Sequence, residues 1–337
     1  MAPEEHIQKR AEFWGSKQCI VTGGGGFLGS HVVEALEAAG CRHIFVVRKA
    51  RYDLTDLHSV RRLFDDAREA RSGLSDAIVM HLAGLSGGIG MNRAFPADFY
   101  YQNMMMNTLI FEQAAKNGIL SLVAAGAGIS YPLAAPAPLN EDTLWDGLPQ
   151  IESASYALSK RMLQIQSYAY WKQFGLPSTV LILGSLYGPR DNFDNQTAPV
   201  IPALITKLVA ATEAGHKDVS VWGTGKATRD FLYVKDAALG FIYAAERCVD
   251  SQVMNIATGH ETSIRDVVSI LSEITGYQGR IIWDTSSPEG AISRHFDTTK
   301  AKTTLGWTAE TSLHDGLRAT IDWYRNAEQH AIHPVDS

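Results

Sequence analysis

The sequence TGGGGFLG at residues 22–29 joins two segments of different periodicity. It follows the apolar run KQCIVT (17–22), which predicts a buried strand, and it opens a stretch (27–39) with apolar residues at helical spacing. Glycine is needed where a tight turn brings the backbone close to a pyrophosphate, and the following helix offers free N–H groups to that anion. The segment therefore predicts a dinucleotide site. The residues assigned to it are Gly23, Gly26, Phe27, Leu28 and Gly29.

Strands and helices alternate along the first half of the chain. The predicted strands are 17–22, 43–47, 77–82, 120–125 and 178–183, and the predicted helices are 27–39, 57–70 and 156–174. Strands separated by helices imply parallel βαβ units with right-handed crossovers. The sequence therefore predicts an α/β fold with a Rossmann-type, doubly wound parallel sheet.

The composition of the chain changes after about residue 185. Gly, Pro, Asp and Asn cluster there, and the later predicted strands are short (219–222, 253–256 and 280–283). We expect a smaller C-terminal α/β domain that binds the substrate. The predicted boundaries are 1–185 for the cofactor domain, with a return segment at about 229–257. The substrate domain is predicted at 186–228 and 258–330.

Composition narrows the class of protein. The chain has 337 residues, is 45% hydrophobic and 20% charged, and carries a formal net charge of −6. These values are typical of a globular protein and give no basic surface for nucleic acid or anionic lipid. No apolar run approaches the roughly 20 residues that span a bilayer. The charged N-terminus and three scattered cysteines predict a cytoplasmic protein without a membrane anchor, disulfide framework or metal site.

The end of the second predicted strand bears on the choice of dinucleotide. An acidic residue there would bind the ribose 2′-hydroxyl of NAD, but no acid precedes Asp53. Arg48 or Arg51 is suited to a 2′-phosphate, so NADP(H) is favoured over NAD(H); the alternative is that both are solvated loop cations. Asp53 and Leu54 lie where they can contact the adenine. The predicted cofactor site also includes Leu82, Ala83 and Gly84, after the third strand.

A YxxxK pair lies on the helix that follows the fourth predicted strand. Tyr156 and Lys160 are four residues apart, so they share one face of that helix. A nearby ammonium group lowers the pKa of a phenol, which lets Tyr156 donate or take a proton at a carbonyl or carbinol oxygen. Both residues are predicted to contact the cofactor as well.

Several longer segments resemble the extended short-chain dehydrogenase/reductase family of nucleotide-sugar enzymes, and within it the GDP-L-fucose synthases. They are GGI (87–89), FPADFYYQNMM (95–105), YALSKRM (156–162), LYGPRDNF (186–193), VIPALI (200–205), VWGTGKATRDFLYVKDAA (221–238), PEGAISRHFD (288–297) and LGW (305–307). The resemblance implies NADPH in the large domain and a nucleoside-diphosphate sugar held by the small one. It also implies a homodimer paired through the helices at about 98–117 and 156–174.

The resemblance assigns roles to individual residues. Tyr156 and Lys160 match the catalytic pair, Arg229 and Arg294 match cations on the substrate diphosphate, and Trp222 matches a residue of the nucleotide pocket. The alternatives are that Arg229 pairs with a neighbouring acid, Asp230 or Asp236, and that Trp222 belongs to the core. Gly88, Ser185, Arg190 and Asn192 complete the predicted substrate site.

Four positions depart from the fucose synthase pattern. Ala127 stands for the active-site Ser, Ile129 for the Cys that exchanges protons with carbon, Arg190 for its partner His and Ser185 for an Asn. Epimerisation beside a ketone needs one group to remove a carbon-bound proton and another to deliver one, and neither Ile nor Arg can do so. Arg190 is expected to add positive charge or clamp a sugar hydroxyl. Ser130 is a candidate replacement for the lost Ser.

We therefore expect an NADPH-dependent reductase of a nucleotide-diphosphate 4-keto-(6-deoxy)sugar, with GDP the favoured nucleotide, that does not epimerise C3 or C5. One alternative is an epimerase that uses a tightly bound cofactor transiently. Another is a catalytically inactive cofactor-binding protein. Dehydration is disfavoured because the acidic pair that it requires is replaced by apolar and hydroxyl residues at 128–130.

Overall fold

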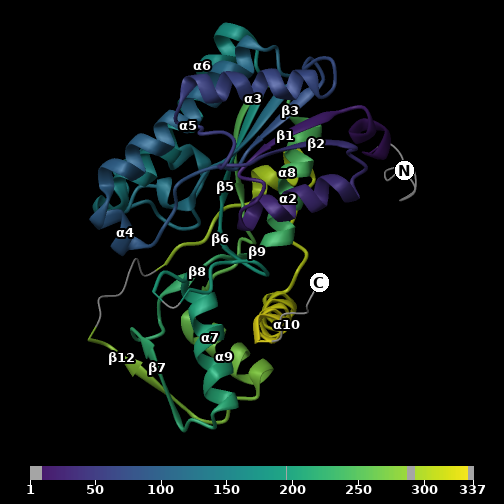
Figure 1. Cartoon of the computed structure of the whole chain (residues 1–337). Helices are drawn as coiled ribbons and strands as arrows, with labels where there is room; N and C mark the ends of the chain where they lie inside the picture. Colours follow the sequence, from purple (N-terminus) through teal and green to yellow (C-terminus); the bar gives the residue numbers. More distant parts are fainter. Residues whose placement is uncertain (1–9, 195, 287–292, 333–337) are drawn as a thin grey trace.

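A six-stranded parallel sheet is the centre of the larger unit (Figure 1). The computed structural model describes residues 10–194, 196–286 and 293–332. The strand order is β2-β1-β3-β4-β5-β10. The strands are β1 (Gln18–Thr22), β2 (His43–Val47), β3 (Ala77–His81), β4 (Ser121–Ala125), β5 (Ser178–Leu183) and β10 (Ser251–Ile256). The chain runs outward from β1 to β2 and then returns to the other side of β1, so the order reverses between β1 and β3. The predicted doubly wound topology is confirmed.

Both faces of this sheet are covered by helices. Every residue of β1, β3, β4 and β5 is buried, as expected for strands with helices on each side. Helices α2 (Phe27–Ala38) and α8 (Val234–Arg247) pack against each other on one face. Helices α3 (Leu57–Glu69), α5 (Pro96–Lys116) and α6 (Ala154–Phe174) share the apolar core on the other face.

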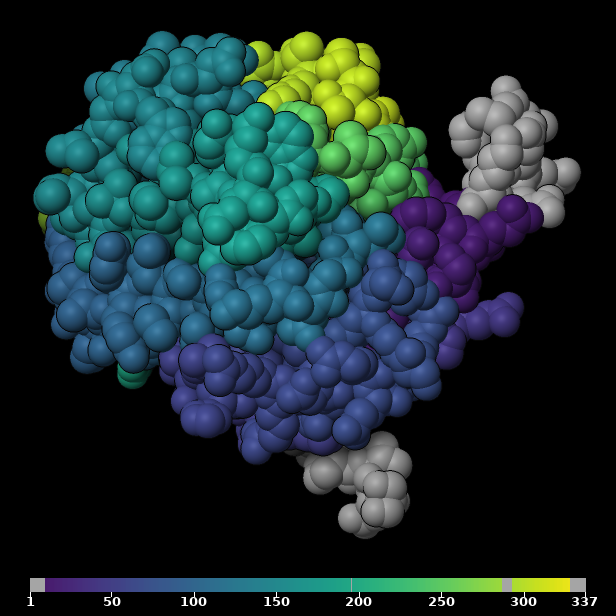
Figure 2. All heavy atoms as spheres, turned by 90° about the horizontal axis from the view of Figure 1, so that it is seen from above, coloured from purple at the N-terminus to yellow at the C-terminus, as the bar shows by residue number. Residues whose placement is uncertain are grey.

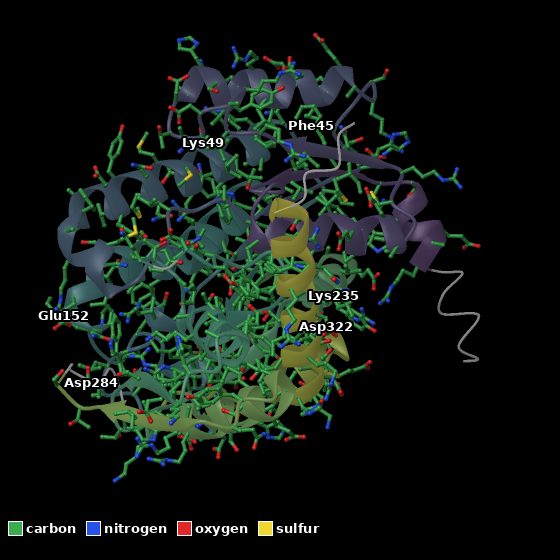
Figure 3. All side chains as sticks on the ribbon, turned by 60° about the horizontal axis from the view of Figure 1, so that its bottom comes forward. Phe45, Lys49, Glu152, Lys235, Asp284 and Asp322 are labelled. Carbon is green, nitrogen blue, oxygen red and sulfur yellow. The ribbon has the colours of Figure 1, made fainter. Side chains whose placement is uncertain are left out.

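The smaller unit lies below the large sheet in Figure 1. Its helices α7 (Val200–Glu213), α9 (Ile264–Thr275) and α10 (Leu313–Ile332) enclose a separate apolar core that includes Ile205, Leu271 and Ile321. Three strand pairs border it: β7 (Asp218–Trp222) with β12 (Arg280–Asp284), β8 (Thr228–Arg229) with β11 (Thr262–Ser263), and β6 (Ser185–Tyr187) with β9 (Phe231–Tyr233). Figure 3 shows Lys49, after β2, and Asp284, at the end of β12, at opposite ends of the molecule.

The chain crosses between the two units several times. After β9 it returns to the large unit as α8 and β10, which pairs with β5 in parallel. The π-helical turn Ala301–Leu305 also packs into the core beneath α2 and α8, where the Trp307 indole donates to the Asp236 carbonyl at 3.1 Å. These crossings place the segments before α6, between β5 and α7, and around Arg294 close together.

Predicted and observed elements agree to within three residues at each end. His81, inside the strand predicted at 77–82, is the last residue of β3 and is fully buried. The short helix α4 (Ile89–Ala94) precedes α5, and three 3-10 turns cover Gly128–Ser130 (η1), Glu141–Thr143 (η2) and Ile151–Ser153 (η3). Among the described helices, none combines the length and apolar content needed to cross a bilayer.

Candidate active site

The glycine turn borders a cavity of about 430 Å³ at the carboxyl end of β1. Gly23 has φ +71°, and a Cβ atom there would lie 2.8 Å from the Ala83 backbone nitrogen. A Cβ at Gly29 would overlap the Gly23 carbonyl oxygen. Gly26 is the N-cap of α2 and offers no side-chain hydrogen bond to the helix, so its first N–H groups are open to a ligand. The turn therefore fits the pyrophosphate of a dinucleotide.

A buried hydrogen-bond chain connects this turn to α6. The Thr22 hydroxyl accepts from the Ala83 N–H at 3.2 Å and lies 2.9 Å from His81 Nδ1. The other ring nitrogen of His81 lies 3.0 Å from the Asn107 amide oxygen, and the Asn107 amide nitrogen donates to the Ser159 carbonyl at 3.1 Å. Burial lowers the pKa of His81 to about 3, so the ring is neutral. No local motif predicts these hydrogen bonds, because Thr22, His81, Asn107 and Ser159 come from four separate elements.

The two candidate arginines of the 2′-phosphate site have different surroundings. Arg48 lines the cavity, and its Nη1 lies 2.5 Å from where a Gly25 Cβ would stand. Arg51 instead pairs with Asp66 at 2.7 Å. Lys49, which the sequence analysis did not assign, also lines the cavity. Arg48 and Lys49 are therefore the two cationic residues in the described lining of this cavity.

Most of the other predicted cofactor residues border the same cavity. Those that line it are Gly23, Gly26, Arg48, Asp53, Leu54, Ala83 and Gly84. Phe27, Leu28 and Gly29 form the first turn of α2 behind the loop, and Leu82 packs into the core. The Asp53 carboxylate accepts from the Thr55 hydroxyl at 2.7 Å and from the Thr55 N–H at 2.8 Å, which lowers its pKa.

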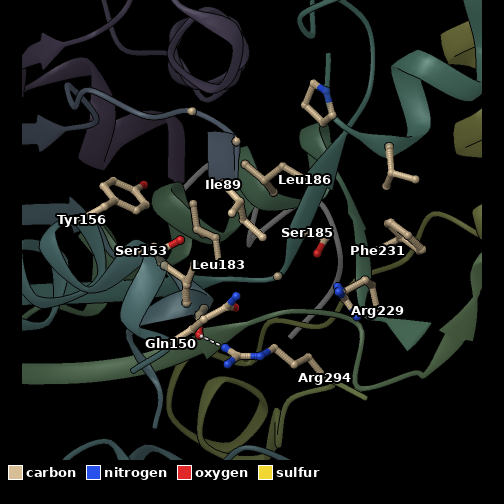
Figure 4. Close-up of a pocket in the computed structure, with 18 of the residues that line it drawn as sticks. Ile89, Gln150, Ser153, Tyr156, Leu183, Ser185, Leu186, Arg229, Phe231 and Arg294 are labelled. Carbon is tan, nitrogen blue, oxygen red and sulfur yellow. Dashed lines mark hydrogen bonds between the residues drawn. The ribbon is translucent and has the colours of Figure 1, made fainter. Parts of the chain in front are cut away.

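A second cavity, of about 530 Å³, lies between the carboxyl edge of the sheet and the smaller unit. Figure 4 shows Tyr156 and Ser153 on one side, with Arg229 and Arg294 toward the other. Four of the predicted substrate residues line it, namely Gly88, Ser185, Arg229 and Arg294. Neither Trp222 nor Asn192 lines it: Trp222 is 71% exposed on β7, and the Asn192 amide donates to the Thr197 hydroxyl at 2.9 Å.

Burial dominates the electrostatics of Tyr156 and Lys160. The Lys160 ammonium donates to the Ala125 carbonyl at 3.0 Å, and burial lowers its pKa to about 8. Burial also raises the pKa of Tyr156 to about 12. This direction is opposite to our expectation that the ammonium group lowers the phenol pKa. A protonated phenol at neutral pH is suited to donating a proton rather than to taking one.

The arginine pair makes the far end of this cavity cationic. Arg229 Nη1 donates to the Thr228 carbonyl at 2.6 Å, and Arg294 Nη1 donates to the Gly128 carbonyl at 3.2 Å. Arg294 Nη2 is buried and has no hydrogen-bond partner among the described residues. Burial, with the charge of Arg229 as a second cause, lowers the pKa of Arg294. Two half-buried arginine side chains beside one cavity favour a multiply charged anion.

The acids proposed as alternative partners of Arg229 have other contacts. The Asp230 carboxylate accepts from the Thr258 and Gly259 N–H groups at 2.8 and 2.9 Å. The Asp236 carboxylate accepts from the Thr311 N–H at 2.9 Å. The Asp230 bonds hold the loop after β10 to the segment between β8 and β9, and the Asp236 bond holds the segment before α10 to α8.

Arg190 does not face the cavity, contrary to its predicted role at the substrate. Its Nη1 and Nη2 donate to the two carboxylate oxygens of Glu34 on α2, at 2.7 and 2.8 Å. Nη2 also lies 2.8 Å from His31 Nδ1. The backbone at Arg190 has φ +68°, so the residue occupies the left-handed region. It therefore anchors the loop after β6 to the large unit.

Ser130 does not replace the missing active-site serine. It is 2% exposed, and its hydroxyl donates to the Ala157 carbonyl of α6 at 3.1 Å. Its own carbonyl accepts from the Arg161 side chain at 2.8 Å. Ser130 is not among the residues that line the cavity, because η1 turns its side chain toward α6.

Ala127 and Ile129 do line the cavity, so the positions of the lost Ser and Cys face it as expected. Of the described lining residues, only Tyr156, Arg229 and Arg294 can titrate. Polar residues missed by the sequence analysis also line it, namely Asn92, Gln150 and Ser153. Elsewhere in the described chain, no group of three or more His, Cys, Asp or Glu side chains could hold a metal ion.

Comparison with known proteins agrees with this architecture. Residues 19–257 match the model of the NAD dependent epimerase/dehydratase family. GDP-L-fucose synthase 1 of Arabidopsis thaliana is 32% identical over 309 residues, covering 92% of this chain and 93% of that protein. These are similarities in sequence along nearly the whole chain.

Two solved structures from Campylobacter jejuni are also similar. A GDP-6-OMe-4-keto-L-xylo-heptose reductase has a TM-score of 0.84 at 27% identity, covering 93% of this chain and 99% of that one. A GDP-mannoheptose C4 reductase, solved with NADP bound, has a TM-score of 0.81 at 27% identity, covering 92% and 99%.

Proposed function

Because this chain belongs to the NAD dependent epimerase/dehydratase family, we propose that it is an NADPH-dependent reductase of a GDP-linked 4-keto-6-deoxysugar. We propose further that it reduces the C4 ketone without epimerising C3 or C5. The names of the similar C4 reductase and of the similar 4-keto-heptose reductase support the reaction. The fucose synthase relative supports GDP as the nucleotide.

The observation that carries the proposal is the set of titratable groups in the Tyr156 cavity. Its described lining holds one phenol and two guanidinium groups. Ile129 stands at the position of the acid/base Cys, and Arg190, at the position of its partner His, pairs with Glu34 and does not line the cavity. Removal of a proton from carbon beside a ketone requires a positioned base. Reduction requires only a hydride and a proton donor, and Tyr156 is a proton donor.

The residues of the cofactor cavity fit NADPH. The glycine turn and the first turn of α2 would hold the pyrophosphate, and Arg48 with Lys49 would hold the 2′-phosphate. The chemistry that NADPH supplies when bound is a hydride for the carbonyl carbon of the sugar. Lys160, whose ammonium lies beside Gly84 and the Ala125 carbonyl, would contact the ribose of the cofactor.

The chain's own residues supply the rest of the reduction. As the carbonyl carbon gains the hydride, its π electrons move to the oxygen, and Tyr156 donates its phenolic proton there to give the alcohol. The phenolate that remains takes up a proton from solvent before the next turnover. Arg229 and Arg294 would hold the diphosphate with charge-assisted hydrogen bonds, placing the sugar toward Tyr156.

The test is an assay of purified protein with NADPH and GDP-4-keto-6-deoxymannose, followed at 340 nm. We expect one NADPH oxidised for each ketone reduced. A tightly held cofactor with sugar conversion but no net oxidation would indicate the epimerase instead. Cofactor binding with no conversion of any kind would indicate a catalytically inactive protein.

We also propose that the protein is a cytoplasmic homodimer paired through α5 and α6. Large apolar side chains are exposed on both helices, including Tyr101 at 57% and Tyr168 at 55%. Figure 2 shows the segments coloured blue and teal, which include these helices, side by side on one face. Light scattering at micromolar concentration should give about twice the 36.8 kDa of one chain. A mass of one chain would contradict the dimer.

A further inference from the structure

Two buried polar atoms at the Tyr156 end of the cavity have no hydrogen-bond partner among the described residues. They are the Ser153 hydroxyl oxygen and the Asn92 amide oxygen, on residues that are 1% and 3% exposed. Both residues line the cavity. Because nearly all buried polar groups in proteins are hydrogen-bonded, an unpaired one calls for an explanation.

Ser153 does not stabilise the helix that it precedes. It is the N-cap of α6, where a serine normally accepts a hydrogen bond from an N–H group of the first turn. Here its φ and ψ are −121° and 13°, outside the extended region, and its hydroxyl makes no capping bond. Tyr156 follows one helical turn later. In Figure 4 the side chains of Ser153 and Tyr156 lie at the same end of the cavity.

The amide nitrogen of Asn92 fixes the orientation of its side chain. Its nitrogen donates to the Gly87 and Gly88 carbonyls at 2.9 and 3.1 Å, which fixes the side chain and leaves its oxygen as an unused acceptor. Asn92 belongs to α4, and α4 packs against η3, which ends at Ser153. The two unpaired atoms therefore come from adjoining elements at one wall of the cavity.

The chemistry of these two atoms restricts which groups of a ligand can be their hydrogen-bond partners. The Asn92 oxygen can only accept, so its partner must donate, and a ketone oxygen cannot. The Ser153 hydroxyl can donate or accept. We propose that Asn92 and Ser153 form a subsite for a hydroxyl group of the sugar ring, close to the ketone that Tyr156 protonates. This inference rests on the proposed function for the identity of the sugar nucleotide.

The test compares binding of GDP-mannose and of GDP to the full chain saturated with NADP⁺, by calorimetry. Ser153→Ala should weaken GDP-mannose by about 3- to 10-fold, the usual loss for one neutral hydrogen bond, and leave GDP within twofold. Its melting temperature should not fall, because the hydroxyl has no partner to lose. Asn92→Ala should weaken GDP-mannose to a similar extent. Ser155→Ala, two residues along the same chain and outside the cavity lining, is the matched control.

Unchanged GDP-mannose affinity in Ser153→Ala would overturn the subsite. So would an equal loss for GDP and GDP-mannose, since that pattern indicates a structural role. The proposed function fails separately, if the wild-type protein oxidises no NADPH with the keto-sugar. The binding ratio decides the subsite even then, because it requires no turnover.

Discussion

The cofactor cavity is built at one edge of the large sheet, whereas the Tyr156 cavity is assembled from both units. The first uses glycine backbone and the exposed cations after β2. The second brings together α4, the turns before α6, the loop after β5, and two half-buried arginines. The cofactor site is therefore a property of the large unit alone, built from the segments after β1, β2 and β3 and from α5. The substrate site depends on how distant segments pack. A change at a single lining position, such as that of Ile129, can alter the chemistry of the site and leave the fold intact.

The largest effect is expected from loss of the Tyr156 hydroxyl, the proposed proton donor. Tyr156→Phe removes the proton donor and retains the ring, so reduction of GDP-4-keto-6-deoxymannose should fall by about 10²- to 10⁴-fold. Tyr168→Phe, on the exposed side of the same helix, is the matched control and should retain its rate. Steady-state oxidation of NADPH measures both. A residual rate within tenfold of wild type would mean that another group donates the proton.

An intermediate effect is expected at the cofactor cavity. Removal of a charge-assisted contact costs about 1.5–3 kcal/mol. Arg48→Ala should therefore weaken NADPH by roughly 10- to 150-fold and leave NADH nearly unchanged. Arg51→Ala should change neither by more than about threefold, because Arg51 pairs with Asp66 on an exposed surface. Fluorescence titration gives the four affinities. Equal losses of NADPH and NADH in Arg48→Ala would refute the 2′-phosphate site.

The smallest effect is expected at Arg190, which anchors the loop after β6 to α2 of the large unit. Its ion pair with Glu34 is partly exposed, so Arg190→Ala should lower the free energy of unfolding by about 0.5–1 kcal/mol. Arg190→Gly should be more stable than Arg190→Ala by about 1 kcal/mol, because glycine adopts φ +68° without strain. Urea denaturation measures both differences. A large rise in KM for the keto-sugar in Arg190→Ala would restore its predicted role at the substrate.

These contrasts explain what the sequence could and could not predict. The glycine turn and its flanking strand and helix are continuous in the chain, so the sheet topology and the core of the cofactor site were predictable. The choice of Arg48 over Arg51 depends on a contact with Asp66, which local spacing does not show.

The substrate side was harder to predict for the same reason. Ser130 and Ser153 are both buried serines near Tyr156. The Ser130 hydroxyl donates to a helix carbonyl, whereas the Ser153 hydroxyl lines the cavity and has no hydrogen-bond partner among the described residues. Arg190 pairs with Glu34, which is 156 residues away in the sequence. Its position outside the cavity could therefore not be predicted from the motif around it. The exposed position of Trp222 likewise depends on how β7 packs against β12.

The measurement that tests the central claim most directly is solvent isotope incorporation during reduction. GDP-4-keto-6-deoxymannose is reduced with NADPH in D₂O, and the product is examined by NMR and mass spectrometry. Because the described lining of the cavity offers no base near C3 or C5, the product should carry no deuterium at either carbon and should retain their configuration. Deuterium at C3 or C5, appearing at a rate comparable to reduction, would contradict the account and show that another group removes those protons.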